Sequence, residues 1–317
     1  MSGQPPRGNG GSSPLHHGLE KVLKKLEWTV IRRLDGLLHG DYRTLFRGFG
    51  LDLADLREYQ YHDDVRHIDW NVTARLQAPY VREFHEDREV TAWFLLDLSQ
   101  SIAFGSQERR KQQISEDFVA VLARVLTRHG NRVGALYYGE DVSGMIPARS
   151  GRRQVLALLD GMQRHAGVKK ESHGTDLGDL FFAAQNLIRR RSLVFVVSDF
   201  ISAPGWSDRL AELSRRHEVV AVRLYDPLES ELPDLGLLVF QDAETGEQLL
   251  VDTHDAGFRR RFADAAEKRE AALRAAFRDA GVDALELSTE EDVLDALVRF
   301  TGLRKRRGRT AVAQISR

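Results

Sequence analysis

The strongest constraint on the fold of this chain is the alternation, from residue 93 to residue 224, of short apolar runs with longer stretches of helical periodicity. The apolar runs predict strands at Trp93–Leu96, Arg132–Tyr138, Leu193–Val197 and Val219–Leu224. The stretches between and after them predict helices near Arg110–His129, Arg152–His165, Gly178–Arg190 and Ser207–Arg216. Alternation of this kind is typical of βαβ units. The sequence therefore predicts an α/β fold, a mostly parallel sheet with helices on both faces.

The remainder of the chain continues this fold to about residue 303. "VFQDAETGEQLLV", residues Val239–Val251, predicts a hairpin about Thr245-Gly246 that forms an antiparallel edge. A helix over Asp255–Asp279 and a strand over Val282–Leu287 follow. Thr289 is expected to cap a closing helix that ends at about Leu303.

The ends of the chain have a different composition from its centre. Residues 1–17 are rich in Gly, Pro and Ser and predict a disordered leader. Residues 18–40 predict a basic amphipathic helix, which packs on its own domain or lies on a membrane surface as a peripheral contact. Residues 41–90 read as a small β-rich segment, residues 91–303 as the α/β domain, and residues 304–317 as a basic tail.

Composition excludes several kinds of function. The 317 residues include no cysteine, so disulfides, thiolate zinc sites and cysteine nucleophiles are ruled out. A net charge of −1 gives no reason to expect nucleic acid as a partner. No run reaches the roughly 18 to 20 apolar residues that cross a bilayer, and "MSGQPPRGNGGSSP" lacks an apolar signal core. We therefore expect a cytoplasmic protein.

The segment "FLLDLSQSIAFG" turns abruptly polar where the first strand of the domain ends. Asp97, Ser99 and Ser101 alternate there, and Asp199 follows the tip of a second apolar run, "SLVFVVSDF". Thr175 lies between them in the chain, in a glycine-containing loop before a helix. Ligands of an open parallel sheet bind beyond the carboxyl ends of its strands. Two carboxylates and three hydroxyls are thus expected to converge on one point.

An all-oxygen set of this kind suits a hard divalent cation, Mg²⁺ or alternatively Mn²⁺ or Ca²⁺. The set resembles the metal-ion-dependent adhesion site of von Willebrand factor A domains, which have a Rossmann-like fold. The resemblance implies that Ser99, Ser101 and Thr175 bind the metal and that Asp97 and Asp199 bind it directly or through water. It also implies that a protein partner completes the shell with an Asp or Glu side chain. The alternative is that these residues only cap turns and helices.

The preceding segment "REYQYHDDVRHIDWNVTAR…YVREFHEDRE" is similar to the signature of bacterial proteins of domain-of-unknown-function family 58. The resemblance implies an accessory or chaperone-like role beside a MoxR-type AAA+ ATPase, with that ATPase or its client as partner. Within the segment, one cluster has a metal-like composition: His62, Asp63, Asp64, His67 and Asp69. We favour a salt-bridged network with Trp70 as its apolar anchor over a second metal or catalytic centre.

An enzyme is the rival interpretation, for instance a metal-dependent phosphohydrolase with Asp97 as nucleophile. Phosphoaspartyl hydrolases of the Asp-x-Asp type need a second carboxylate two residues later, where this chain has Ser99. A nucleophile elbow, a Walker loop and a His-Glu-x-x-His motif are also missing from the sequence. We therefore expect a binding module rather than an enzyme.

Overall fold

The computed structural model describes residues 55–60, 65, 68, 70, 73–74, 78–83, 90–105, 109–139, 141–166, 175–241 and 248–315. The predicted leader, the amphipathic helix with its membrane contact, and all five members of the metal-like cluster lie outside these residues: His62, Asp63, Asp64, His67 and Asp69. Within the predicted β-rich segment, the described strands β1 (Asp55–Glu58) and β2 (Tyr80–Glu83) pair antiparallel. Trp70 is 69% exposed, so the prediction that it anchors this segment is wrong.

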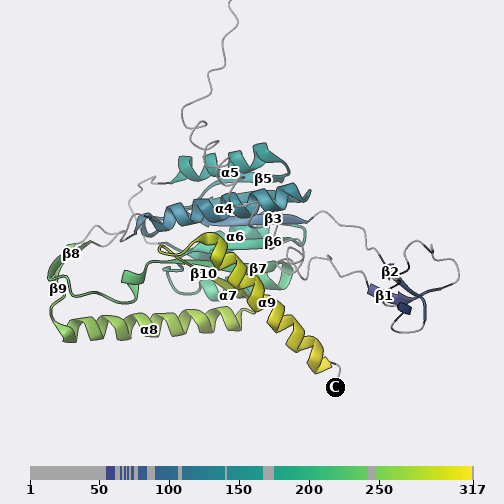
Figure 1. Cartoon of the computed structure of the whole chain (residues 1–317). Helices are drawn as coiled ribbons and strands as arrows, with labels where there is room; N and C mark the ends of the chain where they lie inside the picture. Colours follow the sequence, from purple (N-terminus) through teal and green to yellow (C-terminus); the bar gives the residue numbers. More distant parts are fainter. Residues whose placement is uncertain are drawn as a thin grey trace, which may run out of the picture.

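A six-stranded sheet forms the centre of the α/β domain (Figure 1). Its strands are β3 (Thr91–Asp97), β4 (Arg132–Tyr138), β5 (Val142–Arg149), β6 (Leu193–Ser198), β7 (Glu218–Tyr225) and β10 (Asp283–Ser288). Their spatial order is β10-β7-β6-β3-β4-β5, and every neighbouring pair is parallel except β4 with β5. The predicted fold class is confirmed.

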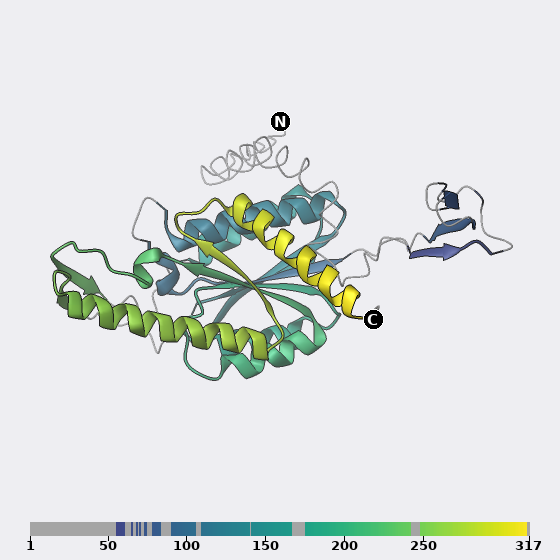
Figure 2. The same ribbon diagram turned by 60° about the horizontal axis from the view of Figure 1, so that its bottom comes forward.

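Period-two alternation along the buried strands divides the core into two layers. In β3, Phe94 and Leu96 face one layer, while Leu95 faces the other. The first layer is covered by α4 (Lys111–Arg128), α5 (Arg152–His165) and α9 (Val293–Ile315). The second is covered by α6 (Leu177–Leu187), α7 (Trp206–Arg216) and α8 (Ala256–Asp279) (Figures 1 and 2).

The antiparallel edge of the sheet is β5, and the prediction that the hairpin near residues 239–251 supplies this edge is wrong. That hairpin, formed by β8 (Leu237–Gln241) and β9 (Gln248–Asp252), is a separate two-stranded sheet. β5 is hard to recognise from the sequence, because "VSGMIPAR" contains Gly144 and Pro147 and has exposed residues at every second position. Proline is tolerated there because an edge strand has amides that need no partner strand.

The last helix begins later and runs further than the sequence predicts. Asp292, and not Thr289, caps α9 by accepting a hydrogen bond from Leu294 N at 2.8 Å. Thr289 Oγ1 instead donates to the buried Asp226 carboxylate at 2.9 Å. The backbone remains helical through Ile315, so the predicted end at Leu303 is wrong. The opposite error occurs at α6, which ends at Leu187 rather than at Arg190.

Strand order places one crevice at the carboxyl ends of β3 and β6. The chain passes from β3 outward to β4 and β5, then returns to the other side of β3 for β6, β7 and β10. Connections therefore leave the adjacent strands β3 and β6 in opposite directions. Loops that diverge in this way open the crevice where doubly wound folds bind their ligands.

His217 follows α7 and is the group for which the fold predicts a pH effect. The side chain is buried, and neither ring nitrogen has a hydrogen-bond partner among the described residues. Burial, helped by the Arg216 charge, lowers the pKa of His217 below its usual value. As pH falls through the ordinary histidine pKa of about 6.5, the unfolded chain therefore binds a proton at His217 that the folded chain does not bind. The free energy of unfolding should decrease over that range.

Urea unfolding at pH 7.5 and pH 5.5 tests this expectation. Wild type should lose more stability on acidification than His217→Leu, in which the titrating group is absent. His129→Gln is the matched control because His129 is exposed. Equal pH dependence of wild type and His217→Leu would contradict the prediction.

Candidate metal centre

Asp97 and Ser198 join the ends of the two strands that border the crevice. Asp97 is the last residue of β3 and Ser198 the last residue of β6, and both are fully buried. Ser198 Oγ donates a hydrogen bond to Asp97 Oδ2 at 2.6 Å. The carboxylate of Asp97 is thereby fixed at the centre of the carboxyl edge of the sheet.

The loop after β3 directs two hydroxyls at each other. Ser99 N donates to Asp97 Oδ1 at 3.0 Å, which turns the chain back over the strand end. Ser99 Oγ and Ser101 Oγ then lie 3.1 Å apart, and both residues are buried. Adjacent ligands of an octahedral Mg²⁺, each at about 2.1 Å from the ion, are separated by about 3 Å. The two hydroxyls are within hydrogen-bond distance of each other, and the same spacing is compatible with two adjacent ligands of one ion.

Asp199 is held beside Asp97 by an unusual backbone conformation. Phe200 has a φ of 59°, in the left-handed region that non-glycine residues rarely occupy. Its amide donates to Ser198 Oγ at 2.9 Å, and its ring packs against Trp206 and Phe277. Asp199 Oδ1 accepts from Ile201 N at 3.0 Å, which completes the turn. Packing and hydrogen bonds thus fix the strained turn and orient the carboxylate.

Thr175 reaches the same edge through its main chain. Its carbonyl oxygen accepts hydrogen bonds from Ala203 N at 2.9 Å and Ser202 Oγ at 3.1 Å, in the loop that carries Asp199. The next residue, Asp176, donates its amide to Tyr138 Oη at 3.2 Å, and Tyr138 is the register partner of Asp97. The buried Thr175 is therefore joined through its main chain to the loop that follows Asp199.

Lys111, which the sequence analysis missed, is an internal cation at this site. Its side chain is 1% exposed, and Nζ lies 2.7 Å from Asp199 Oδ2 and 2.6 Å from Glu229 Oε1. Lys111 is the first residue of α4, where the helix dipole disfavours a positive charge. The local sequence "ERRKQQ" does not distinguish Lys111 from an exposed lysine, so the pairing could be found only from the tertiary structure.

The charges around the site are unbalanced. Burial, followed by repulsion from Asp199, raises the pKa of Asp97 to about 6. Burial alone favours the neutral form of Lys111, but the charges of Asp199 and Glu229 outweigh it and raise the lysine pKa. When all are ionised, three carboxylates face one ammonium. A divalent cation would neutralise the remaining two negative charges, so the donor set fits such an ion.

The residues at this site also limit which ligands a metal ion could have. In the described part of the chain, no three His, Cys, Asp or Glu side chains gather in a way that could hold a metal ion. A cation here would depend on hydroxyl oxygens and bound water. Because Lys111 already pairs with Asp199, that carboxylate is less available to the ion than the adhesion-site pattern implies.

A comparison with known protein families identifies the chain. The family described as "Protein of unknown function DUF58" matches residues 55–272. The chain belongs to the DUF58 family. The uncharacterized protein Rv1480 of Mycobacterium tuberculosis is 37% identical over 292 residues, which cover 91% of this chain and 90% of that protein. The uncharacterized protein MAV169 of Mycobacterium avium is 37% identical over 161 residues, which cover 51% of this chain and 94% of that protein.

Solved structures of similar shape include BatB from Bacteroides thetaiotaomicron and the von Willebrand factor A (VWA) domain of SpRpn10. BatB is 14% identical with a TM-score of 0.44, covering 68% of this chain and 99% of its own. The SpRpn10 domain is 14% identical with a TM-score of 0.36, covering 66% and 94%.

This DUF58 protein has a VWA-like fold. The strand order β10-β7-β6-β3-β4-β5 and the crevice at the ends of β3 and β6 agree with that assignment. Among the described helices, none is both long and apolar enough to cross a bilayer.

Proposed function

We propose that this DUF58 protein is a metal-dependent protein-binding module. Mg²⁺, or Mn²⁺ or Ca²⁺ in its place, would be held by Ser99, Ser101 and Thr175, with Asp97 and Asp199 binding directly or through water. The observation that carries the proposal is the pair of buried serine hydroxyls 3.1 Å apart beside the fixed Asp97 carboxylate. These hydroxyls bring no charge of their own, so they leave the coordination of an added anion to the ion's open positions.

The partner would supply that anion as an Asp or Glu side chain. Lys111 strengthens the expectation, because its ammonium neutralises part of the charge of Asp199 and Glu229. The ligands bound directly to the ion would then be mostly neutral hydroxyl and water oxygens, and a carboxylate from outside could replace a bound water. Following the family resemblance, we propose a MoxR-type AAA+ ATPase or its client as this partner.

Nothing in the site favours the phosphohydrolase alternative. Both oxygens of Asp97 accept hydrogen bonds, from Ser99 N and Ser198 Oγ. The raised pKa also reduces the ionised fraction that a nucleophile needs. Asp97 is placed to orient a ligand shell rather than to attack a phosphate.

A binding measurement with a MoxR-type ATPase from the same organism tests the proposal. Biolayer interferometry should show binding in 5 mM Mg²⁺ and at least about tenfold weaker binding after chelation, because the proposed bridge needs the ion. Alanine substitution of the exposed acidic residues of the ATPase, one at a time, should identify a carboxylate whose loss has the same effect. Binding that is unchanged by chelator would contradict the proposed mode.

A further inference from the structure

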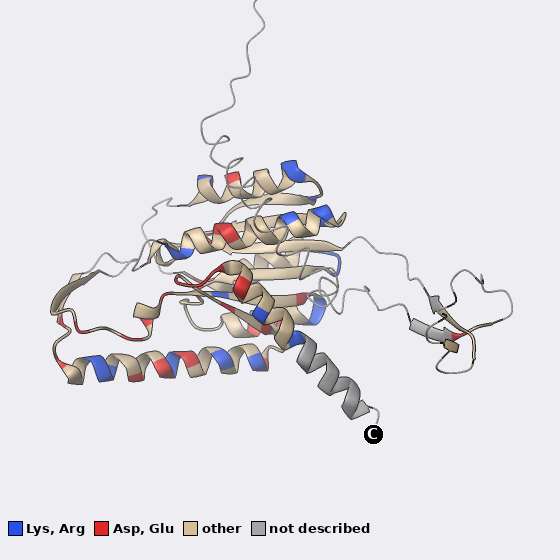
Figure 3. Ribbon diagram, in the orientation of Figure 1, with Lys and Arg blue, Asp and Glu red and all other residues tan. Residues whose placement is uncertain are grey.

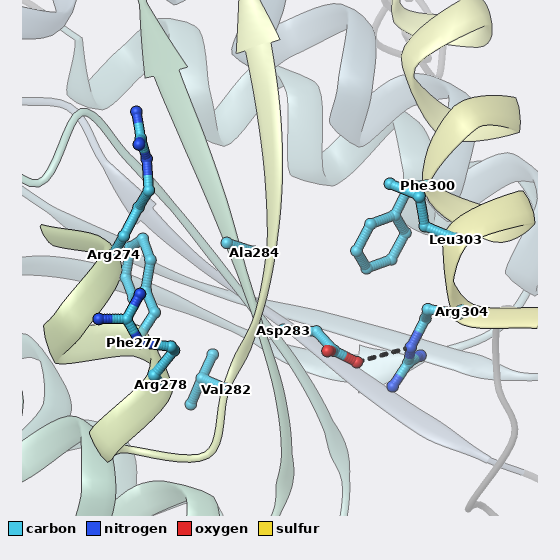
Figure 4. Close-up of a pocket in the computed structure, with 9 residues that line it drawn as sticks. All are labelled: Arg274, Phe277, Arg278, Val282, Asp283, Ala284, Phe300, Leu303 and Arg304. Atoms are coloured by element: carbon cyan, nitrogen blue, oxygen red, sulfur yellow. Dashed lines mark hydrogen bonds and ion pairs between the residues drawn. The ribbon is translucent and has the colours of Figure 1, made fainter. Parts of the chain in front are cut away.

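A second candidate site lies at the other end of the sheet, where β10 begins. A cavity of about 270 Å³ is bounded by the end of α8, the start of β10 and the middle of α9 (Figure 4). Phe277 and Val282 form its wall on the α8 side, and Phe300 and Leu303 form its wall on the α9 side. Ala284 of β10 lies between these walls. The cavity is therefore an apolar notch across an edge strand.

The backbone of β10 is open at this notch. Among the described strands, β10 is the outermost of the sheet and pairs with β7 alone. Thr289 N donates to Tyr225 O at the end of β7, whereas the carbonyl of Glu286 faces the other way and accepts from Arg299 Nη2 at 3.5 Å. Alternate residues of a strand direct their backbone groups to the same side, so Ala284 faces outward like Glu286. Its N–H and C=O can pair with an added strand.

The charge at the notch is positive on one wall. Arg274 and Arg278 of α8 are both exposed. Arg274 lies 3.7 Å from Glu270, and that carboxylate also pairs with Arg223. On the other wall, Arg304 is neutralised by Asp283 at 2.8 Å and Glu218 at 2.7 Å. Two arginines on the α8 side thus remain available to an anionic group.

We propose that this notch binds an extended acidic segment of a partner protein, which adds a strand to β10. Backbone groups of the segment would pair with Ala284. Successive side chains of a strand point to opposite faces, so an Asp or Glu would reach Arg274 and Arg278 while its apolar neighbour packs against Phe300 and Leu303. The recognised sequence is an alternation of acidic and apolar residues. This site is independent of the proposed metal centre.

The charges elsewhere on α8 provide a matched control. Basic and acidic residues are interspersed along the whole exposed length of this helix (Figure 3). Arg260 and Lys268 are exposed, as Arg274 and Arg278 are, but they do not border the notch. The double variants Arg274→Glu/Arg278→Glu and Arg260→Glu/Lys268→Glu therefore make the same change in net charge on the same helix.

The probe is a random twelve-residue peptide library displayed on phage and selected on the purified full-length protein. Selected peptides should be enriched in alternating acidic and apolar residues. Their affinity, measured by fluorescence anisotropy, should fall by about tenfold or more in Arg274→Glu/Arg278→Glu and remain within about twofold in the control variant. Ala284→Pro removes an outward-facing N–H without removing a bond to β7, so it should fold and bind weakly. Thermal unfolding checks the fold of each variant.

Three results would overturn the inference. Selection of peptides without acidic residues would show that the arginines do not specify the ligand. Equal affinity for wild type and Arg274→Glu/Arg278→Glu would place the site elsewhere. Self-association of wild type that Ala284→Pro abolishes, measured by sedimentation, would assign the edge to a second copy of this chain.

Discussion

Lys111→Met is expected to lower the free energy of unfolding by about 3–5 kcal/mol at neutral pH, the usual effect of removing one partner from a buried ion pair. The substitution preserves most of the side-chain volume but leaves Asp199 and Glu229 without their shared cation in a site where Lys111 is 1% exposed. Urea unfolding in chelator measures the loss. Lys268→Met, an exposed lysine on α8, should change stability by less than about 0.5 kcal/mol.

The same variant should bind divalent cations more tightly than wild type, because the ammonium repels an ion and occupies Asp199. Titration calorimetry with Mn²⁺ compares the two proteins. Glu229→Gln in the Lys111→Met background removes one of the unpaired carboxylates and should recover part of the lost stability. A Lys111→Met protein as stable as wild type would show that the ion pair contributes little to folding.

Asp97→Asn is expected to abolish stabilisation by divalent cations while leaving the metal-free protein at least as stable. A ligand at 100 times its dissociation constant stabilises a folded protein by about 2.7 kcal/mol, and the variant should lose that increment. The metal-free expectation follows from the raised pKa of Asp97. At neutral pH the buried, ionised carboxylate lowers the free energy of unfolding, and a neutral amide does not have this effect. Unfolding curves with Mn²⁺ and with chelator, for both proteins, separate these effects.

Asp264→Asn is the control for this experiment, because Asp264 is an exposed carboxylate of α8 far along the chain from the site. It should respond to Mn²⁺ as wild type does. If Mn²⁺ stabilised Asp97→Asn and wild type equally, the ion would bind elsewhere and the proposed metal centre would be wrong. Failure of Mn²⁺ to stabilise any of the proteins would have the same consequence.

Much of the fold could be predicted because buried parallel strands carry a strong local signal. Runs such as "LVFVVS" of β6 are apolar throughout, since both faces of the strand are covered. β5 and the end of α6 were mispredicted because their boundaries depend on neighbours. The edge strand needs apolar residues on only part of its surface, and Ile188 leaves the helix where the chain turns toward β6.

The sequence alone determined that oxygen-bearing side chains stand at the tips of apolar strands, since the alternation of "FLLDLSQS" and the break in "VFVVSDF" are local features. It also determined the fold class and the family resemblance. Only the tertiary structure decided which distant groups share the crevice: it formed the Asp97–Ser198 hydrogen bond and placed Lys111 between Asp199 and Glu229. It also decided that the edge of β10 lies open beside Arg274, away from that crevice. Charge pairing between residues 88 and 118 positions apart is set by how strands and helices pack, and no local pattern encodes it.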